Sequence, residues 1–398
     1  MRDGDTRLPV KAMLLIVPGT AGGFVNFYLL FPVIPRYAQT GGASSLLAGL
    51  CTTAFIAATV LVQPATTRLF PAAGYPRSLT GGALVLGLGA LPMIFSASPA
   101  LIIGCAVVRG TGFGVFVVAA MATITSAMPA SRRGLGASLF GAASGLAGII
   151  GSPAGPWIAS RYGFHAAFCI AALGPLLSVP TALAVDLPRP ARIAAGRIAG
   201  AFRVHARPFL IELTCTAAFG VVFTFLPLVI ATGRAWLVSS ALLTQQLFAV
   251  TARWLAGPWG DRHGSERLLV PAIVLAAAGL CGAVWTAQPV VLLAGMALFG
   301  LGFGALQTVT FVAMLKRSPV AEAETSVSII WNLAFDGGTG IGAACGGVIL
   351  QFAGHELLFG ISALAMLATL LAARSMSRPP VAGLPADECT PPPASLSG

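Results

Sequence analysis

The chain is poor in charged residues. Only 9% of its 398 residues are charged, only 12 are acidic, and 57% are hydrophobic. A water-soluble protein of this length needs a polar surface on every side, and this composition cannot supply one. The shortage of charge therefore excludes an ordinary soluble domain and indicates that lipid surrounds much of the chain.

The chain also has few of the residues that build chemical sites. Its four histidines are too dispersed along the sequence to predict a metal site. Its seven cysteines are an odd number, and six of them lie in apolar segments, so no disulfide framework is indicated. The sequence shows no nucleotide-binding loop and no nucleophile constellation. We therefore expect no cofactor, no metal and no enzymatic activity.

Long apolar stretches are what the chain does contain. A helix needs about 20 residues to cross a hydrocarbon core roughly 30 Å thick. Stretches that meet or approach this length cover residues 12–33, 45–66, 79–96, 99–127, 134–159, 164–185, 208–231, 237–258, 268–287, 289–314, 326–350 and 355–373. They predict an all-α membrane protein with twelve transmembrane helices, and an even number places both termini on one side.

The two halves of the chain repeat each other at a separation of about 190 residues. A Gly-X-Gly-Phe-Gly string occupies residues 110–114 and again residues 300–304. Further pairs at the same spacing or one residue more are Gly74 and Gly264, Arg77 and Arg267, Gly151 and Gly342, Gly155 and Gly346, Gly163 and Gly354, and Phe168 and Phe359. A repeat of this length is a half-molecule of several helices, which is the symmetry of secondary transporters. We predict two pseudo-symmetric six-helix bundles.

Composition shifts divide the chain into four parts. Residues 1–185 form the expected N-terminal bundle and residues 208–374 the C-terminal bundle. Residues 186–207, rich in arginine and containing two prolines, are expected to be a cytoplasmic linker. Residues 375–398, rich in proline, alanine and serine, are expected to be a disordered cytoplasmic tail.

Basic residues are distributed unevenly between the two ends of the predicted helices. Of the 23 lysines and arginines, 18 fall on the side of the termini, and only Arg36, Arg161 and Arg234 fall opposite. Short loops that carry lysine and arginine stay in the cytoplasm, so both termini are expected to be cytoplasmic. The net charge of +11 then records orientation rather than nucleic-acid binding. Arginine outnumbers lysine 21 to 2, which hints at a GC-rich bacterial source and at the cytoplasmic (inner) membrane.

A charged, glycine-rich motif lies at the end of the eighth predicted span. Its residues are Arg253, Gly257, Gly260, Asp261, Arg262, Gly264 and Arg267. This motif resembles the cytoplasmic loop signature of the major facilitator superfamily, in which a carboxylate–guanidinium latch breaks when the two halves rock. A merely solvated loop is the alternative. In the first half, Pro71 and Ala72 stand at the positions that match Asp261 and Arg262, so we expect the second-half latch to dominate.

Three further features resemble the twelve-helix drug:proton antiporter group. In the first, Pro32, Pro35 and Tyr37 close the first span, and Gln63 and Pro64 lie near the end of the second. The second is Arg109, which is followed by the glycines of residues 110–114 and resembles a motif whose buried arginine is linked to proton transfer. Its duplicate is Phe299, which favours a functional role over structural ion pairing. The third, the glycines and prolines of residues 148–156, resembles the antiporter motif in part, and ordinary helix packing is its alternative.

Three ionisable side chains within the predicted spans are candidates for proton coupling: Asp336, Arg109 and Glu212. A charge near the centre of a bilayer is costly and usually serves a pathway or a specific partner. Asp336 lies about ten residues, or roughly 15 Å, into the eleventh span, which makes it the expected proton site. An Asp that caps a broken helix is its alternative. Glu212, near the start of its span, either relays protons or pairs structurally, and it could reach the surface.

Six residues are candidates for the wall of a substrate cavity: Asn26, Phe219, Phe223, Gln307, Trp331 and Asn332. In the resembled fold, their helices line a central cavity. Each of them could instead bond to, or pack against, a neighbouring helix.

These features together predict a secondary transporter that uses a proton gradient to export a small organic compound by alternating access. The direction rests on the resemblance alone. A proton-coupled importer of a nutrient or metabolite is the first alternative, and a non-transporting receptor or scaffold is the second. We expect a monomer whose partners are its substrate, protons and the lipid bilayer, and no nucleic acid.

Overall fold

A computed structural model describes residues 10–129, 133–187, 198–231, 233–317 and 323–376. Most of the expected tail and the central part of the expected linker lie outside these residues. The described part of the chain is helical and contains no strand.

The described residues of the N-terminal half form nine α-helices and three short 3-10 segments. These are α1 (Val10–Leu30), α2 (Val33–Thr40), α3 (Ser45–Val62), η1 (Gln63–Ala65), α4 (Thr66–Ala73), α5 (Tyr75–Leu88), η2 (Leu91–Ile94), α6 (Pro99–Ala127), α7 (Arg133–Tyr162), α8 (Phe164–Leu173), η4 (Gly174–Ser178) and α9 (Val179–Ala184). The first predicted span, 12–33, corresponds to α1, which ends at Leu30, just before Pro32. A separate short helix, α2, then runs from Val33 to Thr40.

In the C-terminal half, the residues that the structure describes form six α-helices and one 3-10 segment. These are α10 (Ile198–Val229), α11 (Ala235–His263), η5 (Ser265–Leu268), α12 (Leu269–Gly282), α13 (Pro289–Lys316), α14 (Ala323–Ala368) and α15 (Leu370–Met376). Helix α10 begins ten residues before the predicted seventh span, so the last part of the expected linker is helical.

The described residues supply twelve passes through a membrane. Ten segments are helical, apolar and long enough to cross a bilayer, and one of them, Val327–Arg374, has 48 residues. Gly354, with φ of 81°, bends this segment so that it makes two passes. Helix α7, with 30 residues, supplies the remaining pass. Many large apolar side chains point outward, among them Leu61 and Val290, which are 78% and 81% exposed. Such a surface suits lipid rather than water.

Glycines with positive φ mark the same helix starts in both halves. The described residues contain six of them, and they form three pairs separated by 190 or 191 residues: Gly42 and Gly233, Gly74 and Gly264, and Gly163 and Gly354. Side chains rarely tolerate this backbone conformation, so glycine is needed at each of these turns. Two of the three pairs are apparent in the sequence repeat, and the shared geometry confirms the duplication.

The Gly-X-Gly-Phe-Gly strings pack equivalent helices together. A methyl group added at Gly112 would lie 2.5 Å from the backbone nitrogen of Leu86, and one added at Gly302 would lie 2.5 Å from that of Ala276. Leu86 and Ala276 are themselves 190 residues apart. Helix α6 therefore crosses α5 as α13 crosses α12, with the backbones in direct contact. The strings are packing motifs in both halves.

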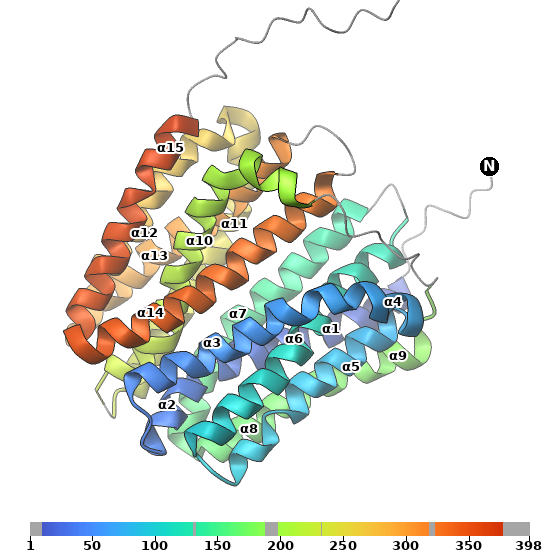
Figure 1. The fold of residues 1–398 in the computed structure, drawn as a ribbon, viewed down its shortest axis with the longest axis horizontal. Helices are drawn as coiled ribbons and strands as arrows, with labels where there is room; N and C mark the ends of the chain where they lie inside the picture. The colour runs from blue at the N-terminus through green and yellow to red at the C-terminus, as the bar shows by residue number, and fades with distance from the viewer. Residues whose placement is uncertain (1–9, 130–132, 188–197, 232, 318–322, 377–398) are drawn as a thin grey trace, which may run out of the picture.

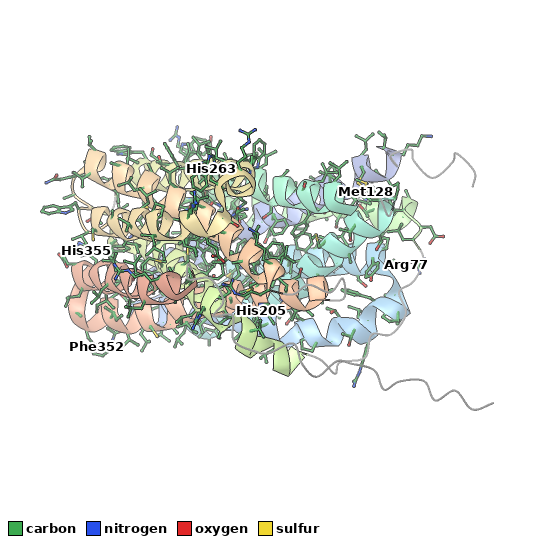
Figure 2. The ribbon with its side chains drawn as sticks, turned by 90° about the horizontal axis from the view of Figure 1, so that it is seen from above. Arg77, Met128, His205, His263, Phe352 and His355 are labelled. Carbon is green, nitrogen blue, oxygen red and sulfur yellow. The ribbon has the colours of Figure 1, made fainter. Side chains whose placement is uncertain are left out.

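The two bundles lie side by side and meet along two seams (Figure 1). Helix α3 packs against α14 along one seam, and α7 packs against α11 along the other. We call the end of the molecule at which α1 begins the terminal face, and the opposite end, which carries α2, the distal face. Arg77 and Met128 lie at the opposite end of the long axis from Phe352 and His355 (Figure 2).

Contacts at the distal face join the two bundles. The Arg36 guanidinium donates hydrogen bonds to the carbonyl oxygens of Pro227 and Leu228, at 3.3 and 3.4 Å. The Leu46 amide donates to Gln351 Oε1 at 3.2 Å. The first of these contacts ties α2 to the end of α10, and the second ties the start of α3 to α14. In this structure the halves are closed against each other at the distal face.

Candidate transport site

Arg109 is held in the N-terminal half by an amide and an aromatic ring. Its Nη2 donates to Asn26 Oδ1 at 3.1 Å, and Asn26 in turn donates to the carbonyl oxygen of Ala171 at 2.8 Å. The guanidinium also lies 5.3 Å from the ring centroid of Phe55. Arg109 is 3% exposed, and no carboxylate pairs with it among the described residues. Asn26 therefore positions Arg109 by bridging α1, α6 and α8.

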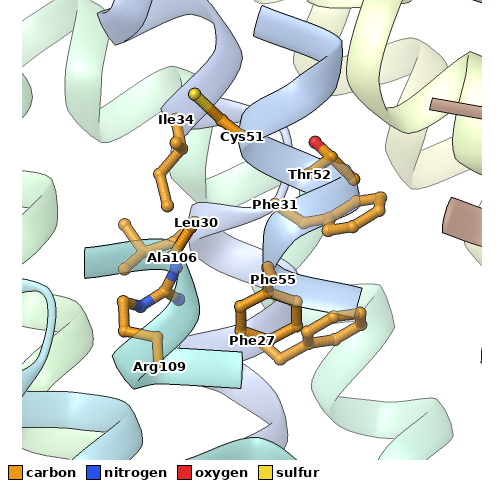
Figure 3. Close-up of a pocket in the computed structure, with 9 residues that line it drawn as sticks. All are labelled: Phe27, Leu30, Phe31, Ile34, Cys51, Thr52, Phe55, Ala106 and Arg109. Atoms are coloured by element: carbon orange, nitrogen blue, oxygen red, sulfur yellow. The ribbon is translucent and has the colours of Figure 1, made fainter. Parts of the chain in front are cut away.

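A small cavity adjoins Arg109. Its lining is mostly apolar, with Phe27, Phe31 and Phe55 on one side and the guanidinium on the other (Figure 3). Its volume of about 20 Å³ holds one water molecule and no organic substrate. At this place the described residues of the N-terminal half therefore form a small apolar pocket beside a buried guanidinium, too small for a substrate in this conformation.

Asp336 bridges the two halves through Gln63. Gln63, directly after α3, donates its side-chain amide to Asp336 Oδ2 at 3.1 Å across the α3–α14 seam. Asp336 is only 7% exposed. Helix α14 continues without a break through Gly337 and Gly338, so the carboxylate does not cap a helix end. Two of the proton-coupling candidates, Asp336 and Arg109, thus have different partners in this structure, Gln63 and Asn26.

Glu212 lies inside the C-terminal half. Its side chain is 0% exposed and does not reach the surface, although Glu212 lies near the start of the predicted span 208–231. Its Oε2 accepts a hydrogen bond from the Thr310 hydroxyl at 2.7 Å, and that hydroxyl accepts one from the Trp331 indole N–H at 3.2 Å. Helices α10, α13 and α14 thus meet at one polar contact.

Arg253 extends this contact to α11. Its guanidinium donates to Gln307 Oε1, and Gln307 lies one helical turn before Thr310. Glu212 and, from the other half, Tyr28 lie within electrostatic range of the guanidinium. Arg253 therefore belongs to the interior of the bundle rather than to the glycine-rich loop that follows it.

We call these side chains the C-terminal polar cluster: Glu212, Arg253, Gln307, Thr310 and Trp331. The cluster contains one acid and one base. It draws its side chains from four helices of one half.

The remaining cavity candidates differ from one another in their surroundings. Phe219 and Phe223 are fully buried, and their rings lie 6.0 and 5.7 Å from the ring of Phe31 across the boundary between the halves. They pack the two halves together. Asn332 is exposed, and its amide bonds to the Ser328 carbonyl oxygen of its own helix at 2.8 Å.

The comparison with known families agrees with this architecture. The family model of the Major Facilitator Superfamily matches residues 16–329 and, in a second and overlapping match, residues 209–393. The chain belongs to the Major Facilitator Superfamily. It is therefore a multi-pass membrane transporter for a small-molecule substrate, and it is not an enzyme.

Individual members of the superfamily show the same relationship at low identity. The chain is 27% identical over 303 residues to a chloramphenicol resistance protein of Streptomyces lividans, over 72% of this chain and 76% of that protein. The solved structure of a mutant of the peptide transporter POT matches with a TM-score of 0.72 and 16% identity, over 92% and 95% of the two chains. The solved structure of the nucleoside transporter NupG matches with a TM-score of 0.67 and 16% identity, over 92% of this chain and 98% of that one. These structures show the shared fold.

The superfamily loop motif is anchored within its own half of this transporter. Helix α11 ends at Gly264, whose φ is 89°. The next residue, Ser265, accepts a hydrogen bond from Lys316 Nζ at 3.0 Å, and Glu266 pairs with Arg317 at 3.6 Å. These contacts tie the loop to the end of α13. In the same motif, Arg262 and Arg267 are exposed. Gly257 has open space beside it, and Gly260 packs on Ser265. The Asp261 side chain lies outside the described residues.

Two polar partners in this Major Facilitator Superfamily member are not apparent from the sequence. The sequence singles out Gln63 only through a family resemblance, yet Gln63 donates the hydrogen bond to Asp336, the expected proton site. Thr310 carries no signal, because threonines in membrane helices usually bond to their own backbone. Its position one turn after Gln307, on a helix expected to line a cavity, is the clue that could have identified it.

Proposed function

We propose that this transporter exports a small organic compound in exchange for protons, with Asp336 as the proton site. The observation that carries the proposal is the position of Asp336, which is buried at the seam between the halves with Gln63 of the other half as its partner. A carboxyl group in lipid is costly when it is charged and is usually retained for a pathway.

The geometry supports coupling between protonation and rocking of the halves. No cation pairs with Asp336 among the described residues, so its hydrogen bond comes from an uncharged amide. Movement of α3 against α14 changes both that bond and the access of water to the carboxyl group. Since the cost of burying the charged form depends on both, each conformation favours a different protonation state.

The proposed direction and location rest on further observations. The resemblance to the chloramphenicol resistance protein supports export of a drug-like compound. The excess of basic residues on the side of the termini supports termini that lie in the cytoplasm. The excess of arginine over lysine, 21 to 2, supports a bacterial source and hence the cytoplasmic membrane. We propose that the protein works as a monomer, because each chain carries both halves and the seams between them.

Everted membrane vesicles acidified by respiration would test the proposal. Chloramphenicol, and a panel of other neutral aromatic compounds, would be added while a fluorescent dye reports the pH gradient. We expect wild type and Glu356→Gln, which alters an exposed carboxyl group near the α14 bend, to lose the gradient when a substrate is added. Asp336→Asn should fold and insert normally but leave the gradient intact.

Three outcomes would contradict the proposal. Transport that persists in Asp336→Asn would exclude Asp336 as the proton site. Uptake into right-side-out vesicles, driven by an inward proton gradient, would show an importer. Identical traces with and without the protein across the whole panel would favour a receptor or scaffold.

A further inference from the structure

The C-terminal polar cluster contains three buried atoms with unused hydrogen-bonding capacity. Within the described residues, Arg253 Nε, Gln307 Nε2 and Glu212 Oε1 have no partner. Gln307 is 4% exposed and Glu212 is 0% exposed, so water at the surface does not satisfy them. A buried polar atom without a partner destabilises the folded protein, because it has lost its hydrogen bonds to water and gained none in return. Three such atoms together indicate that something else completes the cluster.

The three atoms belong to one connected group. Arg253 bonds to Gln307, Gln307 precedes Thr310 by one turn, and Thr310 bonds to Glu212. Two of the unused groups are N–H donors and the third is a carboxyl oxygen. A ligand that completes the group must therefore accept hydrogen bonds at one point and, where Glu212 is ionised, donate one nearby. Hydroxyl and amide groups do both.

The charges of the cluster favour an uncharged ligand. Glu212 and Arg253 are opposite in sign and lie within electrostatic range of each other. A cation drawn to Glu212 would meet Arg253, and an anion drawn to Arg253 would meet Glu212. Neither gains net attraction from a balanced pair, whereas a dipolar group can bond to both.

Aromatic rings lie at the accessible edge of the cluster. Trp331 is partly exposed, and its ring stacks on Phe335 with centroids 5.8 Å apart and an interplanar angle of 29°. Phe311 meets the same indole edge-to-face, also at 5.8 Å. Arg253 is partly exposed as well. A planar ring in the ligand can pack on this surface while its polar group reaches the buried atoms.

We infer that the C-terminal polar cluster binds the transported compound and that this compound is uncharged, with an aromatic ring and a hydroxyl or amide group. The inference rests on the proposed function in taking the bound compound to be the transported one. It assigns Glu212 and Arg253 to substrate recognition and leaves proton coupling to Asp336.

Equilibrium binding to purified protein in lipid nanodiscs would test the inference. The probes are radiolabelled chloramphenicol, which is neutral and carries a ring, hydroxyls and an amide, and tetraphenylphosphonium, a lipophilic cation. Wild type should bind the first and reject the second. In Glu212→Gln, the amide oxygen can keep the hydrogen bond from the Thr310 hydroxyl. The amide NH₂ group then takes the place of Oε1, so the ligand meets a donor instead of an acceptor. Chloramphenicol binding should weaken about tenfold, or 1.4 kcal/mol.

Gln307→Glu makes the complementary change, because it replaces the unused donor with an acceptor while keeping a partner for Arg253. It should also weaken chloramphenicol binding about tenfold. The matched controls are Glu356→Gln and Gln288→Glu, which make the same exchanges at exposed positions in the C-terminal half and should bind as wild type does. Size-exclusion profiles of all four variants establish that they are folded.

Three results would overturn the inference. The first is chloramphenicol binding that neither cluster variant changes. The second is a wild type that binds the cation, and the third is a wild type that binds no member of a panel of neutral hydroxyl-bearing aromatic compounds. The binding assay needs no proton gradient, so its result is independent of the vesicle test. If binding follows the prediction but the vesicle test fails, the proposed proton coupling is contradicted and the recognition site still stands.

Discussion

Replacing one glycine of the first string with alanine should loosen the N-terminal bundle. In Gly112→Ala, the new methyl group would lie 2.5 Å from the Leu86 nitrogen and 2.8 Å from the Gly82 carbonyl oxygen. Ordinary van der Waals contact begins at 3.4 Å. Helices α5 and α6 must therefore separate by roughly 0.9 Å or distort locally, because both contacts are with backbone atoms, which have no rotamer to change.

Gly104→Ala provides a reference on the same helix. Gly104 has no heavy atom within 4 Å of the position of the added methyl group. Alanine favours the helix by up to about 1 kcal/mol over glycine at either site, so this gain cancels when the two variants are compared. What remains is the cost of overpacking, typically about 1–3 kcal/mol. We expect Gly112→Ala to be less stable than Gly104→Ala by this amount.

Unfolding of purified protein in mixed micelles with increasing denaturing detergent would measure the difference. Gly302→Ala should behave as Gly112→Ala does, because its methyl group meets the Ala276 nitrogen at the same 2.5 Å. Equal stability of Gly112→Ala and Gly104→Ala would refute the packing argument. A large effect at only one of Gly112 and Gly302 would refute the equivalence of the two strings.

Three other predictions concern the described contacts. Asn26→Leu removes the described hydrogen-bond partner of buried Arg109 and should cost about 1.5–3 kcal/mol; the folded yield by size-exclusion should fall, and adding Arg109→Met should restore it. Arg36→Gln weakens the distal contacts between the halves, so in a cysteine-free background a membrane-impermeant maleimide should label Thr52→Cys several-fold faster from the distal side. Unchanged labelling would contradict a closing role for Arg36. Gly264→Ala forces a side chain into φ of 89° and should lower stability by about 1–2 kcal/mol, measured as a lower Tm.

The sequence predicts the fold well because the fold depends on local and repeated patterns. Apolar length determines the spans, and the string at 110–114 and its copy determine where helices touch. The end of α1 before Pro32 agrees with the prolines that close the first predicted span, whereas α2 was not predicted, because its eight residues are too few and too polar to form a span. The bend at Gly354 lies in the short gap predicted between the last two spans, and its repeat partner Gly163 is visible in the sequence.

The candidate site was less predictable because it depends on the rotation of helices about their axes. Gln63 and Asp336 are 273 residues apart, and no sequence spacing relates them. Arg253 stands one turn before a recognisable loop motif, which suggests a role in that loop. Its side chain instead bonds to Gln307 of α13, a contact that only the packing of α11 against α13 reveals.

The paired positions of the duplication give the molecule an internal reference. Gly112 and Gly302, which bring backbones together, are identical in the two halves. Gln63 and Asp336, which bond to each other across the seam, are not repeated, since Gln63 corresponds to Arg253 and Asp336 to Gly145. At these positions the two halves share their helix packing and differ in their polar groups. If the same substitution at both positions of a repeat pair has the same effect on the protein, that effect comes from helix packing. If it has an effect at only one of the two positions, that effect comes from the transport chemistry.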